Sequence, residues 1–173
     1  MARILVVAPN WIGDALMAQP LLARLREQRP AAAIDVLAPE WVAAVARRMP
    51  EVDEVIAAPF VHGRLQLGSR WRVGRRLARR GYEQAIVLPN SWKSALVPLF
   101  AGIALRSGYV GESRYGLLNQ LHHKDEAPMV LHYARLARAP GDEPAQPLPE
   151  PRLQIAREEV EATRARFGLP PTY

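Results

Sequence analysis

Residues 3–14, RILVVAPNWIGD, decide the fold of this 173-residue chain. The segment opens with a continuous apolar run that ends at Pro9, and a short apolar run bounded by a turn is typical of a strand buried inside a parallel sheet. A helical pattern of leucines follows from Asp14 to Gln28, and Pro30 ends it. A buried strand followed directly by an amphipathic helix predicts the start of a βαβ unit.

The same alternation of strand and helix continues along the chain. Strands are expected at residues 34–38, 53–57, 84–88 and 106–110, and helices at 39–49, 65–80, 91–102 and 129–137. Residues 111–127 look irregular, whereas 152–155 predict a further strand and 156–167 a further helix. Regular alternation predicts an α/β fold, a Rossmann-like parallel sheet with helices on both faces.

Composition and charge limit the classes of function. With 49% hydrophobic and 23% charged residues, the chain has the composition of one globular domain with a core. It contains no cysteine, which excludes disulfides, thiolate metal sites and a cysteine nucleophile. Residues 64–138 hold 13 basic and 4 acidic residues, a net charge of +9. This excess predicts an anionic partner or, with equal weight, a solvated helix of an arginine-rich protein.

The loop after the first strand is the first place to look for a site, because ligands of parallel sheets bind at the carboxyl ends of strands. Residues 8–14, APNWIGD, contain one glycine and match neither a dinucleotide fingerprint nor a phosphate-binding P-loop. This argues against dinucleotide oxidoreductases and NTPases. Gly13 permits close backbone approach. Asp14 is either an ordinary acidic residue at a helix start or a general base that faces the cleft.

A metal site is not expected. His122 and His123 with Asp125 are the obvious candidates, but adjacent histidines point apart on any regular element. No third ligand follows at a suitable spacing. No cofactor is expected either.

Three stretches resemble the ADP-heptose:lipopolysaccharide heptosyltransferases, glycosyltransferase family 9. They are ILVVAPNWIGDALMAQP at residues 4–20, LPNSWKSA at 88–95 and GESRYGLLN at 111–119. The first has the P-x-W-x-G-D-x-x-M-x-Q run of the family's heptosyltransferase II branch. The resemblance implies a GT-B glycosyltransferase, in which an N-terminal domain holds the acceptor and a C-terminal domain holds the nucleotide-sugar.

The resemblance also implies a reaction and a division of the chain. The reaction is an inverting transfer of heptose from ADP-L-glycero-D-manno-heptose to the inner core of lipopolysaccharide, with Asp14 as the general base. Residues 1–138 would form the acceptor-binding domain, the proline-rich stretch 139–151 a linker, and residues 152–173 the approach to a donor-binding domain outside this chain. The chain alone would then be nearly inactive. The expected acceptor-binding residues are Gly13, Arg75, Arg79, Lys93, Arg114 and Asn119.

An acceptor of this kind lies in an anionic membrane leaflet, so the resemblance implies a cytoplasmic protein, peripheral at the inner face of the inner membrane of a Gram-negative bacterium. The basic segment would serve that membrane surface. The alternative is a basic Rossmann-like module that binds nucleic acid or another anionic polymer. Nucleic acid is not the expected partner, because no reader motif accompanies the arginines. A receiver-like module is disfavoured, because Ala57-Ala58-Pro59 stand where a receiver needs an aspartate.

Overall fold

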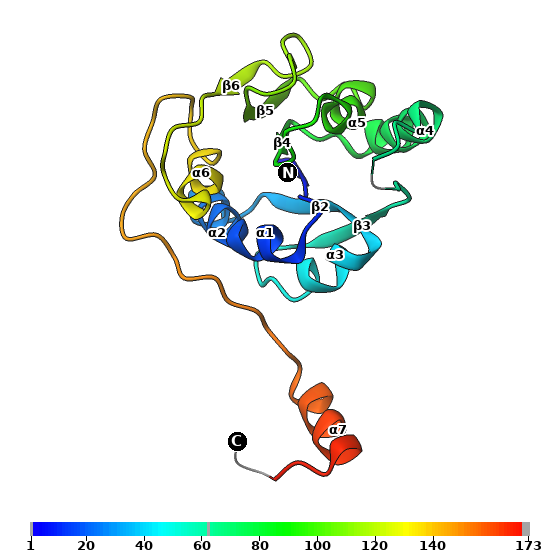
Figure 1. The fold of residues 1–173 in the computed structure, drawn as a ribbon, viewed down its shortest axis with the longest axis vertical. Helices are drawn as coiled ribbons and strands as arrows, with labels where there is room; N and C mark the ends of the chain where they lie inside the picture. Colours follow the sequence, from blue (N-terminus) through cyan, green and yellow to red (C-terminus); the bar gives the residue numbers. More distant parts are fainter. Residues whose placement is uncertain (1, 62, 171–173) are drawn as a thin grey trace.

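A computed structural model describes residues 2–61 and 63–170 and contains one six-stranded sheet (Figure 1). The strands are all parallel and lie in the order β3-β2-β1-β4-β5-β6. Their bounds are β1 Arg3–Val7, β2 Ala33–Pro39, β3 Glu54–Ala58, β4 Gln84–Val87, β5 Leu105–Tyr109 and β6 Gln120–His122. The predicted Rossmann-like α/β fold is confirmed.

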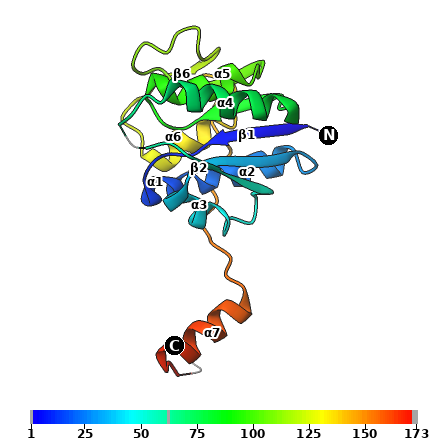
Figure 2. The same ribbon diagram turned by 90° about the vertical axis from the view of Figure 1, so that its right-hand side faces the viewer.

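Helices cover both faces of the sheet, because the apolar residues of β1 alternate between two cores. Ile4 and Val6 point to one core, which is covered by α1 (Ile12–Met17), α2 (Gln19–Gln28), α3 (Glu40–Ala46) and α6 (Met129–Arg135). Leu5 and Val7 point to the other core, which is covered by α4 (Leu67–Leu77), the 3-10 turn Trp92–Ala95 and α5 (Leu96–Phe100). The two helical layers lie on opposite sides of the sheet in Figure 2.

Two helical segments differ from their expected form. The helix expected from Asp14 to Gln28 is two helices, which meet at Ala18. Pro20 explains the break, because proline has no N–H to continue the hydrogen bonds of the first helix. The basic helix expected at residues 65–80 is α4 followed by the 3-10 turn Ala78–Arg80.

Two strand predictions were wrong. β6 lies within the stretch expected to be irregular, and its Leu121 pairs with Gly108 of β5. A strand of three residues is too short to show a strand pattern in the sequence. Residues 152–155 join no strand of the described sheet, although the Gln154 N–H donates to the Arg48 carbonyl at 2.7 Å. The following helix, α7 (Arg157–Phe167), stands apart from the sheet at the end of an extended segment (Figure 1). Within the described ranges, no helix is long and apolar enough to cross a membrane.

Gly74 lets α4 pack closely on α5. A methyl group at this position would lie 2.5 Å from Phe100 Cβ and 2.9 Å from the Val97 carbonyl oxygen. We expect Gly74→Ala to lower the free energy of unfolding by about 1–3 kcal/mol, because two backbones must separate to admit the methyl group. Denaturant unfolding monitored by circular dichroism measures this change.

Gly68 in the same helix provides the control. A methyl group there meets no atom of the described residues within 4 Å. Gly68→Ala is therefore expected to leave the free energy of unfolding unchanged or to raise it by up to about 1 kcal/mol, since alanine favours helix. Equal losses in both variants would show that close α4–α5 packing is not the cause.

Candidate functional site

β1 and β4 lie side by side in the sheet, but the chain leaves them toward opposite faces. After β1 it enters α1, and after β4 it enters the 3-10 turn Trp92–Ala95 on the other side. Such a switch point leaves a crevice at the carboxyl ends of the two strands. Two adjoining pockets lie there, and both are lined by Asn10, Pro89 and Ser91 from the loops that diverge.

The first pocket, which we call the Asp14 pocket, has a volume of about 280 Å³ and contains Asp14 from the first turn of α1. Asp14 is half-buried, and its carboxylate forms no hydrogen bond or ion pair within residues 2–61 and 63–170. Its side chain therefore does not cap the helix, and its oxygens are available to a ligand. The other polar side chains of this pocket are Asn10, Asn90, Ser91, Tyr109, Lys124 and Tyr133.

Tyr133 lies close enough to Asp14 for the carboxylate charge to affect its titration. Burial raises the pKa of Tyr133 to about 12, and the charge of Asp14 adds to the rise. The phenol therefore keeps its proton at neutral pH. Lys124 lies in the same pocket, with Nζ 5.7 Å from the centre of the Tyr109 ring.

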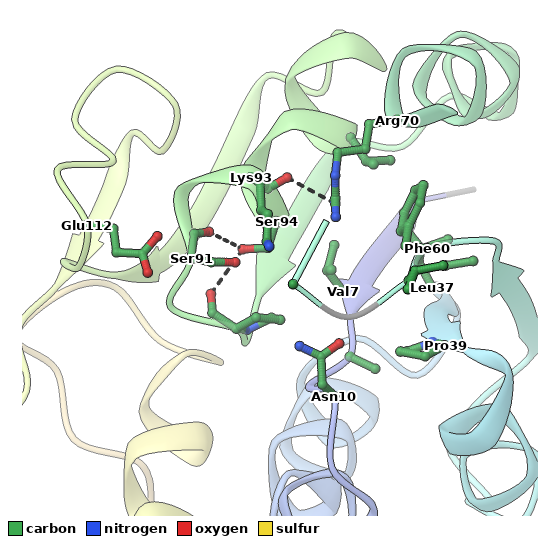
Figure 3. Close-up of a pocket in the computed structure, with 16 residues that line it drawn as sticks. Val7, Asn10, Leu37, Pro39, Phe60, Arg70, Ser91, Lys93, Ser94 and Glu112 are labelled. Atoms are coloured by element: carbon green, nitrogen blue, oxygen red, sulfur yellow. Dashed lines mark hydrogen bonds between the residues drawn. The ribbon is translucent and has the colours of Figure 1, made fainter. Parts of the chain in front are cut away.

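The second pocket, the Arg70 pocket, has a volume of about 270 Å³ and is shown in Figure 3. The Arg70 side chain points into it, although only 6% of the residue is exposed. Its Nε–H donates to the Leu65 carbonyl at 2.6 Å, and Nη1 donates to the Lys93 carbonyl at 3.1 Å. The guanidinium also lies over the Phe60 ring, 4.3 Å from its centre.

The buried guanidinium of Arg70 has no acidic partner among the described residues, which suits it to bind an anionic ligand. Burial lowers its pKa, but a guanidinium stays protonated at neutral pH. Among the described residues no carboxylate pairs with it: Glu112, across the pocket, instead accepts a hydrogen bond from the Trp92 N–H at 3.0 Å. Lys93 lines the same pocket. The pocket thus combines two cations and the Glu112 carboxylate with apolar walls from Val7, Leu37 and Val97.

Arg114 was expected to contact the acceptor, but it lies inside the protein with 1% of its surface exposed. Its Nη1 donates to the Pro89 carbonyl at 2.5 Å and Nη2 donates to the Tyr109 carbonyl. Burial lowers the pKa of Arg114 to about 10. The side chain therefore ties together the segments that follow β4 and end β5. In this position it holds the wall of the crevice and lines neither of the two pockets.

Three other expected contacts lie away from the crevice. The Asn119 side chain accepts from the Arg106 N–H at 2.8 Å and donates to the Ala104 carbonyl at 2.7 Å, at the amino end of β5. Arg75, in α4, and Arg79, in the 3-10 turn that follows it, are exposed, and this part of the chain returns toward the amino edge of the sheet. The residue after Arg79, Arg80, pairs with the first residue of β3, Glu54, at 2.5 Å.

Of the expected site residues, Asp14 and Lys93 line the crevice, each in a different one of its two pockets, and Gly13 is exposed next to Asp14 in the chain. A methyl group at Gly13 would meet no atom of the described residues within 4 Å, so a ligand has room to approach. His122 is buried and His123 is exposed. Within the described part of the chain, no three His, Asp or Glu residues are grouped closely enough to hold a metal ion.

Sequence reasoning missed several pocket residues. Asn10, Asn90 and Ser91 follow β1 and β4 directly, so the rule that found Asp14 was sufficient to find them. Lys124 follows β6, a strand that the pattern did not reveal. Tyr133 gave no signal, because a tyrosine on the apolar face of a helix looks like any core residue.

Comparisons with known proteins identify the relatives of this chain. Residues 70–173 match the model of glycosyltransferase family 9 (heptosyltransferase). The chain is 46% identical to lipopolysaccharide heptosyltransferase 2 of Escherichia coli K12, over 96% of this chain and 50% of that protein. It is 43% identical to lipooligosaccharide heptosyltransferase 2 of Haemophilus ducreyi, over 96% of this chain and 49% of that protein. The chain thus spans about half the length of the curated relatives it matches.

Solved structures agree. The structure of E. coli ADP-heptose LPS heptosyltransferase II superposes with a TM-score of 0.88 at 42% identity, covering 98% of this chain and 51% of that one. A family 9 glycosyl transferase from Veillonella parvula shares the fold with a TM-score of 0.83 at 18% identity, covering 99% and 51%.

The internal position of Arg114 predicts a structural role. Arg114→Met keeps most of the side-chain volume but removes the Arg114 donor from the Tyr109 carbonyl and leaves the Pro89 carbonyl with the Ser94 hydroxyl alone, at 3.2 Å. We expect the free energy of unfolding to fall by about 2–4 kcal/mol, because losing hydrogen bonds from a buried charged donor is costly. Arg75→Met, at an exposed position, should change it by less than about 0.5 kcal/mol. Chemical denaturation of both variants measures the difference. Parental stability of Arg114→Met would contradict the structural role.

Proposed function

Since the chain belongs to glycosyltransferase family 9, the heptosyltransferase family, we propose that it is the acceptor-side half of an inverting heptosyltransferase. The enzyme transfers L-glycero-D-manno-heptose from ADP-heptose to the inner core of lipopolysaccharide. The observation that carries this proposal is an unpaired carboxylate, Asp14, in a crevice pocket of a chain 46% identical to an LPS heptosyltransferase 2. Residues 1–138 form the acceptor domain, 139–151 the linker, and 152–173 lead toward the donor-binding half.

Asp14 supplies the base that a one-step inversion needs. The oxygen of an acceptor hydroxyl forms a bond to the anomeric carbon while the bond from that carbon to ADP breaks. The hydroxyl proton passes to the Asp14 carboxylate as the new bond forms. Half-exposure suits this task, because the proton can then leave to solvent and restore the carboxylate.

The Arg70 pocket supplies the recognition of charge on the acceptor. Arg70 is held by the Leu65 and Lys93 carbonyls, so little side-chain freedom is lost when an anion binds. A carboxylate or phosphate of the inner core would satisfy Arg70 and Lys93 together. The apolar walls strengthen the attraction by excluding water.

Arg75 and Arg79 serve a different anionic partner, the membrane surface. Both side chains are exposed, on α4 and on the 3-10 turn after it, away from the crevice. Each basic residue near an anionic leaflet contributes about 1 kcal/mol of binding free energy. The protein is accordingly a peripheral protein at the cytoplasmic face of the inner membrane.

Asp14→Asn in the full-length enzyme tests the base. Asparagine keeps the shape of the side chain but takes up the proton poorly, so kcat should fall by about 10²–10⁴-fold while the acceptor KM changes little. Steady-state heptosyl transfer measures both. The matched control is Glu40→Gln, which removes an acidic charge from the first turn of α3 outside both pockets and should leave kcat unchanged. Near-parental turnover of Asp14→Asn would move the proton acceptor elsewhere in the cleft.

Two further variants separate sugar recognition from membrane binding. Lys93→Gln removes a cation from the Arg70 pocket, so the KM for deacylated inner-core oligosaccharide should rise about tenfold. Arg75→Gln combined with Arg79→Gln should leave that KM unchanged and weaken binding to vesicles of anionic lipid by about 10–30-fold. Kinetics and vesicle sedimentation measure the two effects. If the Lys93 variant and the double arginine variant change the same quantity, either the oligosaccharide KM or vesicle binding, a single surface serves both the sugar and the membrane.

A further inference from the structure

Three tyrosines are more than nine-tenths buried, and their hydroxyl groups can be compared directly: Tyr82, Tyr109 and Tyr133. The Tyr82 hydroxyl donates to the Asp35 carboxylate at 2.5 Å, and the Tyr109 hydroxyl donates to the His132 carbonyl at 2.7 Å. The Tyr133 hydroxyl forms no hydrogen bond with any residue that the structure describes. The Tyr133 hydroxyl is not one of the fully buried polar atoms that lack a partner, so it is open to the pocket it lines. A hydroxyl on an otherwise buried side chain that has no internal partner needs an explanation.

The position of Tyr133 supplies one. Its ring belongs to the core beneath α6, and the residue lines the Asp14 pocket. The carboxylate of Asp14 is near enough to add to the rise in the pKa of Tyr133, which reaches about 12. The pocket therefore holds a fixed donor, the phenol, beside a free acceptor, the carboxylate.

A sugar is the ligand whose chemistry fits such a pair. One sugar hydroxyl can donate its proton to a carboxylate while the oxygen of a neighbouring hydroxyl accepts a hydrogen bond from a phenol. A rigid tyrosine loses little conformational entropy when it makes this contact, since its ring is already fixed by the core. A site built to hydrogen-bond a hydroxyl also rejects ligands that lack it, because the buried donor is then left unpaired.

We propose that the Tyr133 hydroxyl binds the acceptor sugar, donating a hydrogen bond to the hydroxyl next to the one that Asp14 deprotonates. The inference rests on the proposed function and deepens it, because it assigns a second acceptor contact in the Asp14 pocket. Tyr133 is a substrate-binding residue that sets the orientation of the sugar and takes no proton in the reaction.

Tyr133→Phe in the full-length enzyme tests this directly, because it removes one oxygen and keeps the ring in the core. No internal hydrogen bond is lost, so the melting temperature should stay at the parental value. The KM for deacylated inner-core oligosaccharide should rise about tenfold, with kcat changed by less than about threefold and the KM for ADP-heptose unchanged.

Tyr82→Phe is the matched control. It removes the same atom from a buried tyrosine that lines neither crevice pocket, and it breaks the internal bond to the Asp35 carboxylate. Its melting temperature should fall while the acceptor KM stays parental. The two variants thus exchange their effects on stability and on acceptor recognition, which a purely structural role for both tyrosines would not produce.

A parental acceptor KM in Tyr133→Phe would overturn the proposal and assign the hydroxyl to solvent. A lowered melting temperature with a parental KM would overturn it too, since the hydroxyl would then have a structural partner. Calorimetric binding of the same oligosaccharide to parental and Tyr133→Phe enzyme keeps this test separate from the proposed function. Absence of heptosyl transfer by the parental enzyme defeats the proposed function, whereas a tenfold loss of oligosaccharide affinity in Tyr133→Phe still supports the contact.

Discussion

The site depends on one constraint, which is that β1 must be buried on both faces while its chain leaves toward only one of them. Ile4 and Val6 face one core and Leu5 and Val7 face the other, so helices are required on both sides of the sheet. The chain meets this requirement by sending α1 to one side after β1 and the Trp92–Ala95 turn to the other side after β4. The crevice between them is a consequence of covering the sheet, and both pockets lie in it.

A crevice formed by diverging loops needs something to hold its walls, and Arg114 does so from within. A guanidinium almost excluded from water is costly unless its donors are satisfied. Carbonyls of Pro89, after β4, and Tyr109, at the end of β5, accept from its two terminal nitrogens, whereas Nε has no partner among the described residues. The backbone just before Arg114 adopts the left-handed conformation at Glu112 and Ser113, with φ of 43° and 53°. This segment therefore turns sharply, and the turn brings the Arg114 side chain into the protein. The particular residues of the segment serve to position Arg114.

The fold was predictable because hydrophobic patterning and topology leave few choices. The place of Asp14 at the crevice was predictable because the sequence showed where β1 ends, whereas its role as a base stays a prediction. It was also predictable that Arg75 and Arg79 lie far from the crevice. A crossover helix that follows β3 runs back toward the amino edge of the sheet, so its last turn lies far from the site. The burial of Arg114 and the unpaired hydroxyl of Tyr133 were not predictable, since both depend on which carbonyls and side chains meet in space. Three residues of β6 carry too little pattern to reveal a strand.

Under the proposed reaction, the geometry of inversion explains why acceptor contacts gather at one edge of the sheet. In a one-step displacement the attacking oxygen and the leaving group lie on opposite sides of the anomeric carbon. Under the proposed reaction, Asp14 fixes the attacking side at the carboxyl edge of the sheet, and Tyr133 and Arg70 hold the acceptor against that edge. The diphosphate must then face away from the sheet, where groups outside the described chain stabilise its charge. Acceptor and donor contacts therefore fall naturally into two halves that meet across the crevice.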